Sequence, residues 1–126
     1  MKIRVYYEDT DMGGVVYHSN YINFCERARS EVFFEVGLSP ALKTGHFVAK
    51  KLTANYIASA KLGDMLNVIT TLKEMRAASF TLNQIIYKDE KKIFEMEIVL
   101  AYVTLEGRVQ KLDDNIKKTI VSLFEK

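Results

Sequence analysis

One long amphipathic segment, followed only by segments with alternating apolar residues, most restricts what this chain can fold into. Between about Tyr17 and Val36 the apolar residues recur at steps of three and four, at Tyr21, Phe24, Cys25, Ala28, Val32 and Val36. This spacing places them on one face of a helix, and Gly37 directly after the last of them is typical of a helix end. The sequence therefore predicts a long helix over residues 17–36.

The segments around this helix predict strands. A short strand is expected at 2–8, and longer ones at 46–58, 65–75, 78–88 and 92–104, where the last shows the clearest alternation at Phe94, Met96, Ile98, Leu100 and Tyr102. Asp113 is suited to cap a terminal helix with apolar residues Ile116, Ile120, Leu123 and Phe124. One long helix and several antiparallel strands predict an α+β fold with the helix packed on one sheet face.

Length and composition limit the class of protein. The 126 residues fit one domain, 1–126, with an ordinary balance of 48% apolar and 27% charged residues. The basic pair Lys50-Lys51 is too small for a nucleic-acid surface, so no nucleic-acid partner is expected. Cys25 is the one cysteine, and the sequence offers neither an apolar leader nor a membrane span. We expect a cytoplasmic protein.

Three carboxylates crowd the predicted loop at residues 9–16 and the end of the strand before it. They are Glu8, Asp9 and Asp11, and the pair Gly13-Gly14 follows them. In a purely structural interpretation, Asp9 and Thr10 make side-chain bonds to the turn backbone while the other carboxylates are solvated. Such a turn does not by itself require three acids, so a chemical role is left open beside the structural one.

A calcium loop is one chemical alternative. Asp9, Asp11 and Gly14 fall at the first, third and sixth positions of that pattern, but Gly13 occupies the fifth and Asn20 the twelfth, where a bidentate Glu is required. The two histidines lack ligand-like spacing, and a single cysteine cannot form a cysteine-based zinc site. No metal is expected.

The junction between this loop and the helix offers a second chemistry. Free N–H groups at a helix start attract a developing negative oxygen, and glycines before it allow a ligand to approach the backbone. Asp11, Gly13-Gly14 and Tyr17-His18 place a carboxylate, a glycine turn and a helix start within eight residues. The carboxylate could then attack a carbonyl bound at the helix start, or deprotonate a water beside it.

Two further reactive side chains lie in this region. His18 at the helix start is interpreted as a hydrogen-bonding or capping residue, with a catalytic role as the alternative. Cys25 lies on the apolar helix face and is expected to be a buried, inert thiol. Nucleophile-elbow, phosphate-loop and dinucleotide motifs are absent from the sequence.

The same region carries a family resemblance, which extends over nearly the whole chain. The chain resembles the hotdog-fold acyl-CoA thioesterases, within them the 4-hydroxybenzoyl-CoA thioesterase group, and particularly its YbgC branch associated with the Tol–Pal system. The resemblance rests on Tyr7-Glu8-Asp9-Thr10-Asp11-x-Gly13-Gly14-Val15-Val16-Tyr17-His18-x-x-Tyr21, Glu26-Arg27-Ala28-Arg29, Ala60-Lys61-Leu62-Gly63-Asp64 and Met75-Arg76-Ala77-Ala78-Ser79-Phe80.

This resemblance implies a fold and a set of site residues. It implies a hotdog, an antiparallel sheet wrapped around one central helix, assembled into dimers or tetramers with active sites at the dimer interface. Asp11 matches the catalytic carboxylate, and His18 matches a histidine of the YbgC branch. The backbone near Gly14, Val15, Tyr17 and His18 would bind the substrate carbonyl. No cofactor is implied, since CoA is part of the substrate.

The chain departs from the family pattern at the residues expected to contact CoA. Arg76 and Ser79 match positions proposed to meet CoA phosphates, but Ala77 and Ala78 replace the rest of the family's basic cluster. We therefore expect a short- or medium-chain aliphatic acyl-CoA as substrate instead of an aromatic one.

The sequence thus predicts a metal-free acyl-CoA thioesterase of lipid metabolism, with Asp11 as nucleophile or general base. A hotdog dehydratase acting on a hydroxyacyl thioester, using His18 with Asp11, is one alternative. A non-catalytic scaffold that binds phospholipid-synthesis or envelope proteins is the other.

Overall fold

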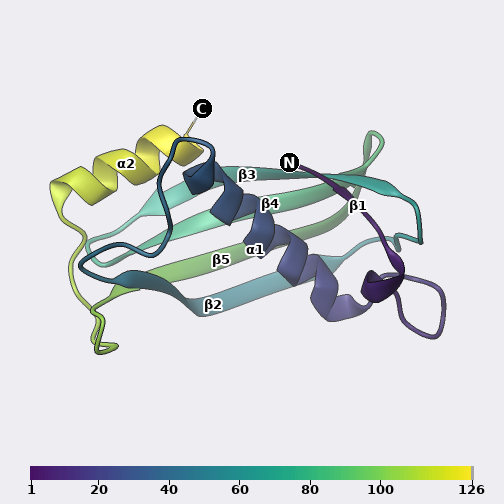
Figure 1. Cartoon of the computed structure of the whole chain (residues 1–126), viewed down its shortest axis with the longest axis horizontal. Coiled ribbons are helices and arrows are strands. Elements are labelled where there is room, and N and C mark those ends of the chain that lie inside the picture. The colour runs from purple at the N-terminus through teal and green to yellow at the C-terminus, as the bar shows by residue number, and fades with distance from the viewer. Residues whose placement is uncertain (126) are drawn as a thin grey trace.

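One antiparallel sheet carries a long helix across one of its faces in the computed structural model, which describes residues 1–125 (Figure 1). The strands follow the spatial order β1-β3-β4-β5-β2, and every neighbouring pair is antiparallel. In chain order the elements are β1 (Lys2–Arg4), the 3₁₀ turn η1 (Tyr7–Asp9), α1 (His18–Phe34), β2 (His46–Tyr56), β3 (Met65–Met75), β4 (Ser79–Lys88), β5 (Lys91–Val103) and α2 (Asp114–Phe124). The predicted α+β class is confirmed.

Helix α1 buries the face that its apolar spacing predicts, with one exception. Phe24, Cys25 and Ala28 are buried against the sheet. The helix then ends at Phe34, and Gly37 adopts a φ of +77° while the Leu38 N–H donates to the Phe33 carbonyl at 3.0 Å, a typical helix-terminating arrangement. The expectation that Val36 lies on the buried face is wrong, because the helix stops before it. Phe33 is buried instead.

The inner faces of β4 and β5 form the floor of the core. Phe80, Leu82 and Ile86 of β4 point into the core, and β5 presents Phe94, Met96, Ile98, Leu100 and Tyr102. Strand β3 has the predicted bounds. Strand β2 begins at His46, where the strand predicted over 46–58 also begins.

Helix α2 closes one end of the core. The Asp113 carboxylate accepts a hydrogen bond from the Ile116 N–H at 2.8 Å, which confirms the predicted cap. Phe124 of α2 packs edge-on against Phe33 of α1, with ring centroids 5.9 Å apart. Figure 1 shows α2 at the carboxyl end of α1, while the loop before α1 lies at the opposite end of the sheet.

Strand β2 leaves one long edge of the sheet unpaired within the chain. It has eleven residues, pairs only with β5, and exposes most of its side chains, among them Val48, Leu52 and Tyr56. The β2–β5 register shifts between Ala49 and Lys51, so Lys50 forms a bulge in this edge.

Candidate active site

Turn η1 and the loop that follows it place their three carboxylates in different environments. Asp9 is buried, and its Oδ2 accepts the Tyr6 N–H at 2.8 Å. The Thr10 hydroxyl donates to the Tyr7 carbonyl at 3.0 Å. These are the turn bonds of the structural interpretation. Glu8 and Asp11 remain exposed, so Asp9 supports the loop and leaves the other two carboxylates available to solvent or ligand.

Asp11 sits in a tight glycine turn. Its carbonyl accepts the Gly14 N–H at 3.0 Å, its own N–H donates to the Val15 carbonyl at 2.9 Å, and its Oδ1 accepts the Gly13 N–H at 2.8 Å. Gly14 has a φ of +79°, which an L side chain rarely adopts. The turn therefore fixes one carboxylate oxygen on the backbone and leaves Oδ2 without a protein donor among residues 1–125.

The start of α1 supplies free backbone donors beside this turn. The Tyr17 N–H donates to the Asp9 carbonyl at 2.9 Å, and the Asn20 N–H donates to the Tyr17 carbonyl at 2.8 Å. Between them, the N–H groups of His18 and Ser19 lie in the first helical turn, where no intrahelical acceptor is available. Of the four residues predicted to bind the substrate carbonyl, Gly14 and Tyr17 already donate their N–H groups to the Asp11 and Asp9 carbonyls, whereas His18 retains its donor.

Asp11 and His18 meet at one surface hollow. A cavity of about 290 Å³ is lined by both of them and by Val15, Val16, Tyr21, Tyr56, Ile57, Ala58 and Ser59. The His18 ring packs on Tyr17, with centroids 4.4 Å apart. A carboxylate and a free helix-start N–H thus border one space that is open to a small ligand.

The segment after β2 was missed as part of the site. Tyr56 donates from its hydroxyl to the His18 carbonyl at 2.9 Å, and Ile57 to Ser59 complete the lining. These residues lie 45 to 48 positions after Asp11, and no sequence spacing links them to it. Their position follows from the pairing of β2 with β5, which is visible only in the fold.

Tyr21 and Asp64 hold this segment in place. The Ala60 N–H donates to the Tyr21 hydroxyl at 3.0 Å, and burial raises the pKa of that phenol above its usual value. Burial would also raise the pKa of Asp64, but a hydrogen bond from the Lys61 N–H and the charge of Lys88 outweigh it and hold that pKa below its usual value. The motif at residues 60–64 therefore supports the floor of the site.

Arg76 and Ser79, the predicted CoA contacts, lie far from Asp11 within one chain. The Asp11 loop adjoins the start of β3, and the β3–β4 turn that carries Arg76 lies at the other end of the sheet (Figure 1). Ten residue steps along β3 correspond to about 33 Å. Arg76 pairs with Glu74 at 3.0 Å and borders a polar hollow with Lys51 and Lys73 on the outer sheet face.

Neither a candidate metal cluster nor a candidate membrane-spanning helix is found among the residues that the structure describes. Over residues 1–125, no group of three His, Cys, Asp or Glu side chains is placed to hold a metal ion. No helix within the same range has both the length and the apolar character needed to cross a membrane.

One long helix packed across an antiparallel sheet of strand order β1-β3-β4-β5-β2 is the hotdog fold. The chain belongs to the thioesterase-like superfamily, whose family model matches residues 5–120.

Curated relatives and solved structures agree with this class. The acyl-CoA thioesterase YbgC of Helicobacter pylori is 42% identical over 112 residues, covering 82% of this chain and 84% of the relative. The acyl-CoA thioester hydrolase YbgC of Escherichia coli is 41% identical over 105 residues, covering 80% and 78%. A probable thioesterase from Bartonella henselae superposes with a TM-score of 0.84 at 28% identity, covering 90% of this chain and 97% of that one. The predicted hotdog fold and acyl-CoA thioesterase family are confirmed.

Proposed function

We propose that the chain hydrolyses aliphatic acyl-CoA thioesters at the hollow between Asp11 and His18. The observation that carries this proposal is the pairing of a turn-fixed Asp11 carboxylate with free N–H groups at the start of α1 in one cavity. The YbgC relatives named as acyl-CoA thioesterases support the thioester as the bond that is cleaved.

In the proposed mechanism the thioester carbonyl oxygen accepts the His18 N–H, whose partial positive charge stabilises the oxygen as it becomes negative. Asp11 either attacks the carbonyl carbon or removes a proton from an attacking water. By both routes the C–S bond breaks and CoA leaves as a thiol. On the first route water then cleaves the anhydride formed with Asp11, and on the second route the oxygen of water enters the acid product directly. The Gly13 N–H keeps the carboxylate directed during the reaction. The residues invoked use no metal and no cofactor.

A direct test replaces the carboxylate with its amide. We expect Asp11→Asn to lower kcat/KM for acyl-CoA hydrolysis about 10²–10⁴-fold, the range attributed to a positioned acid or base. Glu8→Gln is the matched control, because Glu8 lies in the adjoining turn η1, is exposed, and does not border the hollow. Wild-type activity in Asp11→Asn would remove Asp11 from the mechanism.

The same assay separates the two alternative functions. A dehydratase would raise the absorbance of an enoyl thioester without releasing free thiol. A scaffold would release no thiol from any acyl-CoA and would retain its protein partners in the Asp11→Asn variant. Partners in phospholipid synthesis, an association with Tol–Pal and a cytoplasmic location stay predictions from the sequence.

We also propose that two copies join through β2. A long, exposed edge strand with apolar side chains invites pairing with another strand. A two-fold axis through the middle of β2 would continue the sheet into the second copy, and a further pairing of dimers would give the predicted tetramer. Such a dimer would bring the β3–β4 end of one copy toward the Asp11 end of the other, as contact of Arg76 and Ser79 with CoA requires. Light scattering measures the assembly.

A further inference from the structure

Two tyrosines border the hollow between Asp11 and His18, and their hydroxyl groups differ. Tyr56 is half exposed, and its O–H donates to the His18 carbonyl at 2.9 Å. Tyr21 is only 3% exposed, and its hydroxyl oxygen accepts the Ala60 N–H at 3.0 Å. Its own O–H proton has no acceptor among residues 1–125. Because buried donors are rarely left without an acceptor, this proton points to a ligand group in the hollow.

The wall of the hollow places the Tyr21 hydroxyl beside the space for a ligand. Ala58 and Ser59 line that wall, and the Tyr21 oxygen is bonded to the N–H of the next residue, Ala60. On the other side, the Val16 N–H donates to the Ala60 carbonyl at 2.9 Å. The backbone that forms the wall therefore holds the hydroxyl oxygen of Tyr21 at its base.

Tyr21 also lies on the face of α1 that carries His18. Residues three apart are neighbours on a helix surface, and a helical side chain leans toward the amino terminus. Tyr21 therefore extends toward the first turn, where the His18 N–H is free. Phe94, stacked at a centroid distance of 5.3 Å, and Tyr56, edge-on at 5.7 Å, hold the Tyr21 ring. The two free donors thus converge from one helix turn on one hollow.

The Tyr21 phenol keeps its proton at neutral and mildly alkaline pH. Burial raises its pKa above the ordinary value, although the hydrogen bond from the Ala60 N–H opposes this shift. The charges of Tyr56, Asp64 and Asp11 raise the pKa further. The phenol can therefore donate to an oxygen that becomes negative, and it adds no negative charge of its own beside the Asp11 carboxylate.

We propose that the Tyr21 hydroxyl is a second donor to the thioester carbonyl oxygen, together with the His18 N–H. This inference rests on the proposed hydrolysis at Asp11. The proton stays on the phenol throughout. Its hydrogen bond strengthens as Asp11 or water adds to the carbonyl carbon and the oxygen becomes negative, and it weakens again when the C–S bond breaks. Tyr21 is then a catalytic residue whose role appears only when the helix packs against residues 58–60.

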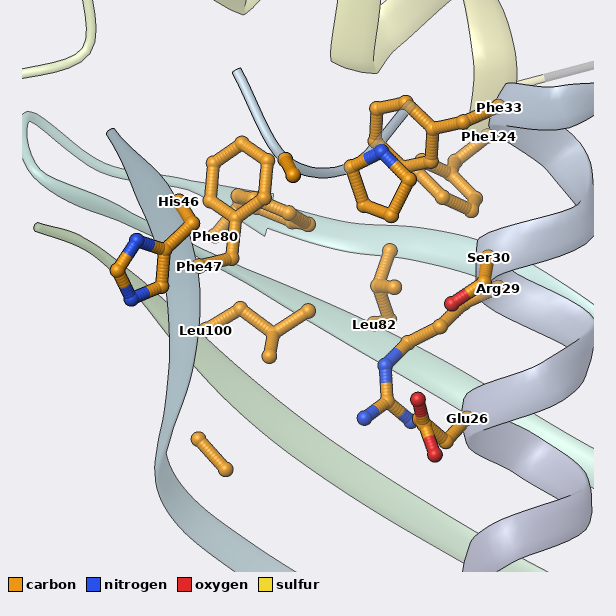
Figure 2. A pocket seen from close by; sticks show the side chains of 13 residues that line it. Glu26, Arg29, Ser30, Phe33, His46, Phe47, Phe80, Leu82, Leu100 and Phe124 are labelled. Carbon is orange, nitrogen blue, oxygen red and sulfur yellow. The ribbon is translucent and has the colours of Figure 1, made fainter. Parts of the chain in front are cut away.

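A larger cavity, of about 340 Å³, is separate from this hydroxyl. Figure 2 shows it between α1 and β2, with Arg29, Phe33 and Phe47 among the side chains that line it. Tyr21 is not part of this lining. Removing the Tyr21 hydroxyl therefore leaves the larger cavity unchanged, and an effect on kcat can be assigned to the Asp11 hollow.

Deleting the hydroxyl tests the proposed role. We expect Tyr21→Phe to lower kcat for acyl-CoA hydrolysis about 10²–10³-fold, as when one donor to a developing oxyanion is removed, with little change in KM. Tyr102→Phe is the matched control, because it also deletes a buried hydroxyl, which is bonded to Thr44 and does not border the hollow. An unchanged kcat in a Tyr21→Phe protein that circular dichroism shows to be folded would overturn the proposal.

A fluorinated side chain separates donation from structural support, because Tyr21→Phe also removes the acceptor of the Ala60 N–H. Tyr21→difluorotyrosine keeps the ring and an oxygen that can accept this N–H, but its phenol is a stronger acid. We expect kcat to fall once the phenol ionises, so the alkaline limb of the pH–rate profile should move toward neutral pH. Tyr102→difluorotyrosine should leave the profile as in the wild type. A profile unmoved by the substitution at Tyr21 would reduce its hydroxyl to a structural role.

A measurement without turnover separates this inference from the proposed hydrolysis. Octanoyl-CoA labelled with ¹³C at its carbonyl is bound to the Asp11→Asn protein, and difference infrared spectroscopy records the carbonyl stretch. A hydrogen bond to the oxygen lowers this frequency, so adding Tyr21→Phe should raise it. Equal frequencies in the two proteins would overturn Tyr21 as a donor. A raised frequency, combined with no thiol release from the wild type, would instead overturn only the hydrolysis.

Discussion

The backbone N–H of Gly13 donates to Oδ1 of Asp11 at 2.8 Å, and a Cβ atom at Gly13 would lie 3.2 Å from that same oxygen. Gly13 therefore orients the Asp11 carboxylate through its N–H. Because Gly13 has no side chain, it also leaves room for that carboxylate. The relationship makes the position of Asp11 sensitive to a methyl group on its neighbour.

We expect Gly13→Ala to lower kcat about tenfold or more, because displacing a catalytic group by a fraction of an ångström weakens its alignment with the carbonyl. The thermal midpoint should change little, since Gly13 is exposed and its φ is not positive. Gly14→Ala is the contrasting variant. It forces an L side chain to a φ of +79° and should destabilise the fold by about 1 kcal/mol. Unaltered kcat in Gly13→Ala would show that the Asp11 carboxylate need not be held by this turn.

The two roles proposed for Asp11 differ in where an oxygen from water first appears. If Asp11 attacks the carbonyl and water then cleaves the resulting anhydride at the Asp11 carbon, a single turnover in ¹⁸O-water labels Asp11. If Asp11 acts as a base, the label enters only the acid product. Mass spectrometry of the peptide containing Asp11 distinguishes these outcomes, and the Asp11→Asn protein gives the background.

Cys25 should resist alkylation in the folded protein. Its side chain is fully buried, and burial raises the pKa of the thiol to about 12, so the reactive thiolate is scarce at neutral pH. We expect iodoacetamide to modify Cys25 only under denaturing conditions, as measured by intact mass. Raising the pH from neutral to mildly alkaline should leave the native protein unmodified. Rapid labelling without denaturant would contradict the buried, inert thiol predicted from the sequence.

Asp64 should stabilise the fold in a pH-dependent way. Its pKa is lowered in the folded state despite the opposing effect of burial, because the Lys61 N–H and Lys88 favour the charged form. The stabilisation is thus fully present above the unfolded pKa of about 3.9 and is lost as the pH falls through the lower folded value. Urea unfolding should show wild type more stable than Asp64→Asn at neutral pH, with the difference shrinking below about pH 4. A difference that stayed constant into this acidic range would refute the assignment.

The helices and strands could be predicted because their apolar periodicity is local. The bounds of β3 and the cap at Asp113 match the sequence, since both depend on nearby residues. Phe33 was missed because a helix end redirects the chain, and the spacing that favoured Val36 assumes that the helix continues.

The site residues differ in the same way, since some could be predicted from the local sequence and others could not. Asp11, Gly14, Val15 and His18 lie within eight residues, and their local order predicts the turn and the helix start. Tyr56 and the residues after it enter the hollow only through sheet pairing. The engagement of the Tyr17 N–H by the Asp9 carbonyl also depends on how the loop folds back on itself, which residue spacing does not determine.

The packed rings of Tyr21, Phe24 and Phe94 have a consequence for how such a protein can diversify. They separate the first turn of α1, which borders the Asp11 hollow, from a cavity of about 340 Å³ beside the later half of the helix. Substitutions on one side are separated from the other by tightly packed rings. Substitutions at Ser30 or Ala41, which line that cavity, would therefore leave the packing around Asp11 unchanged.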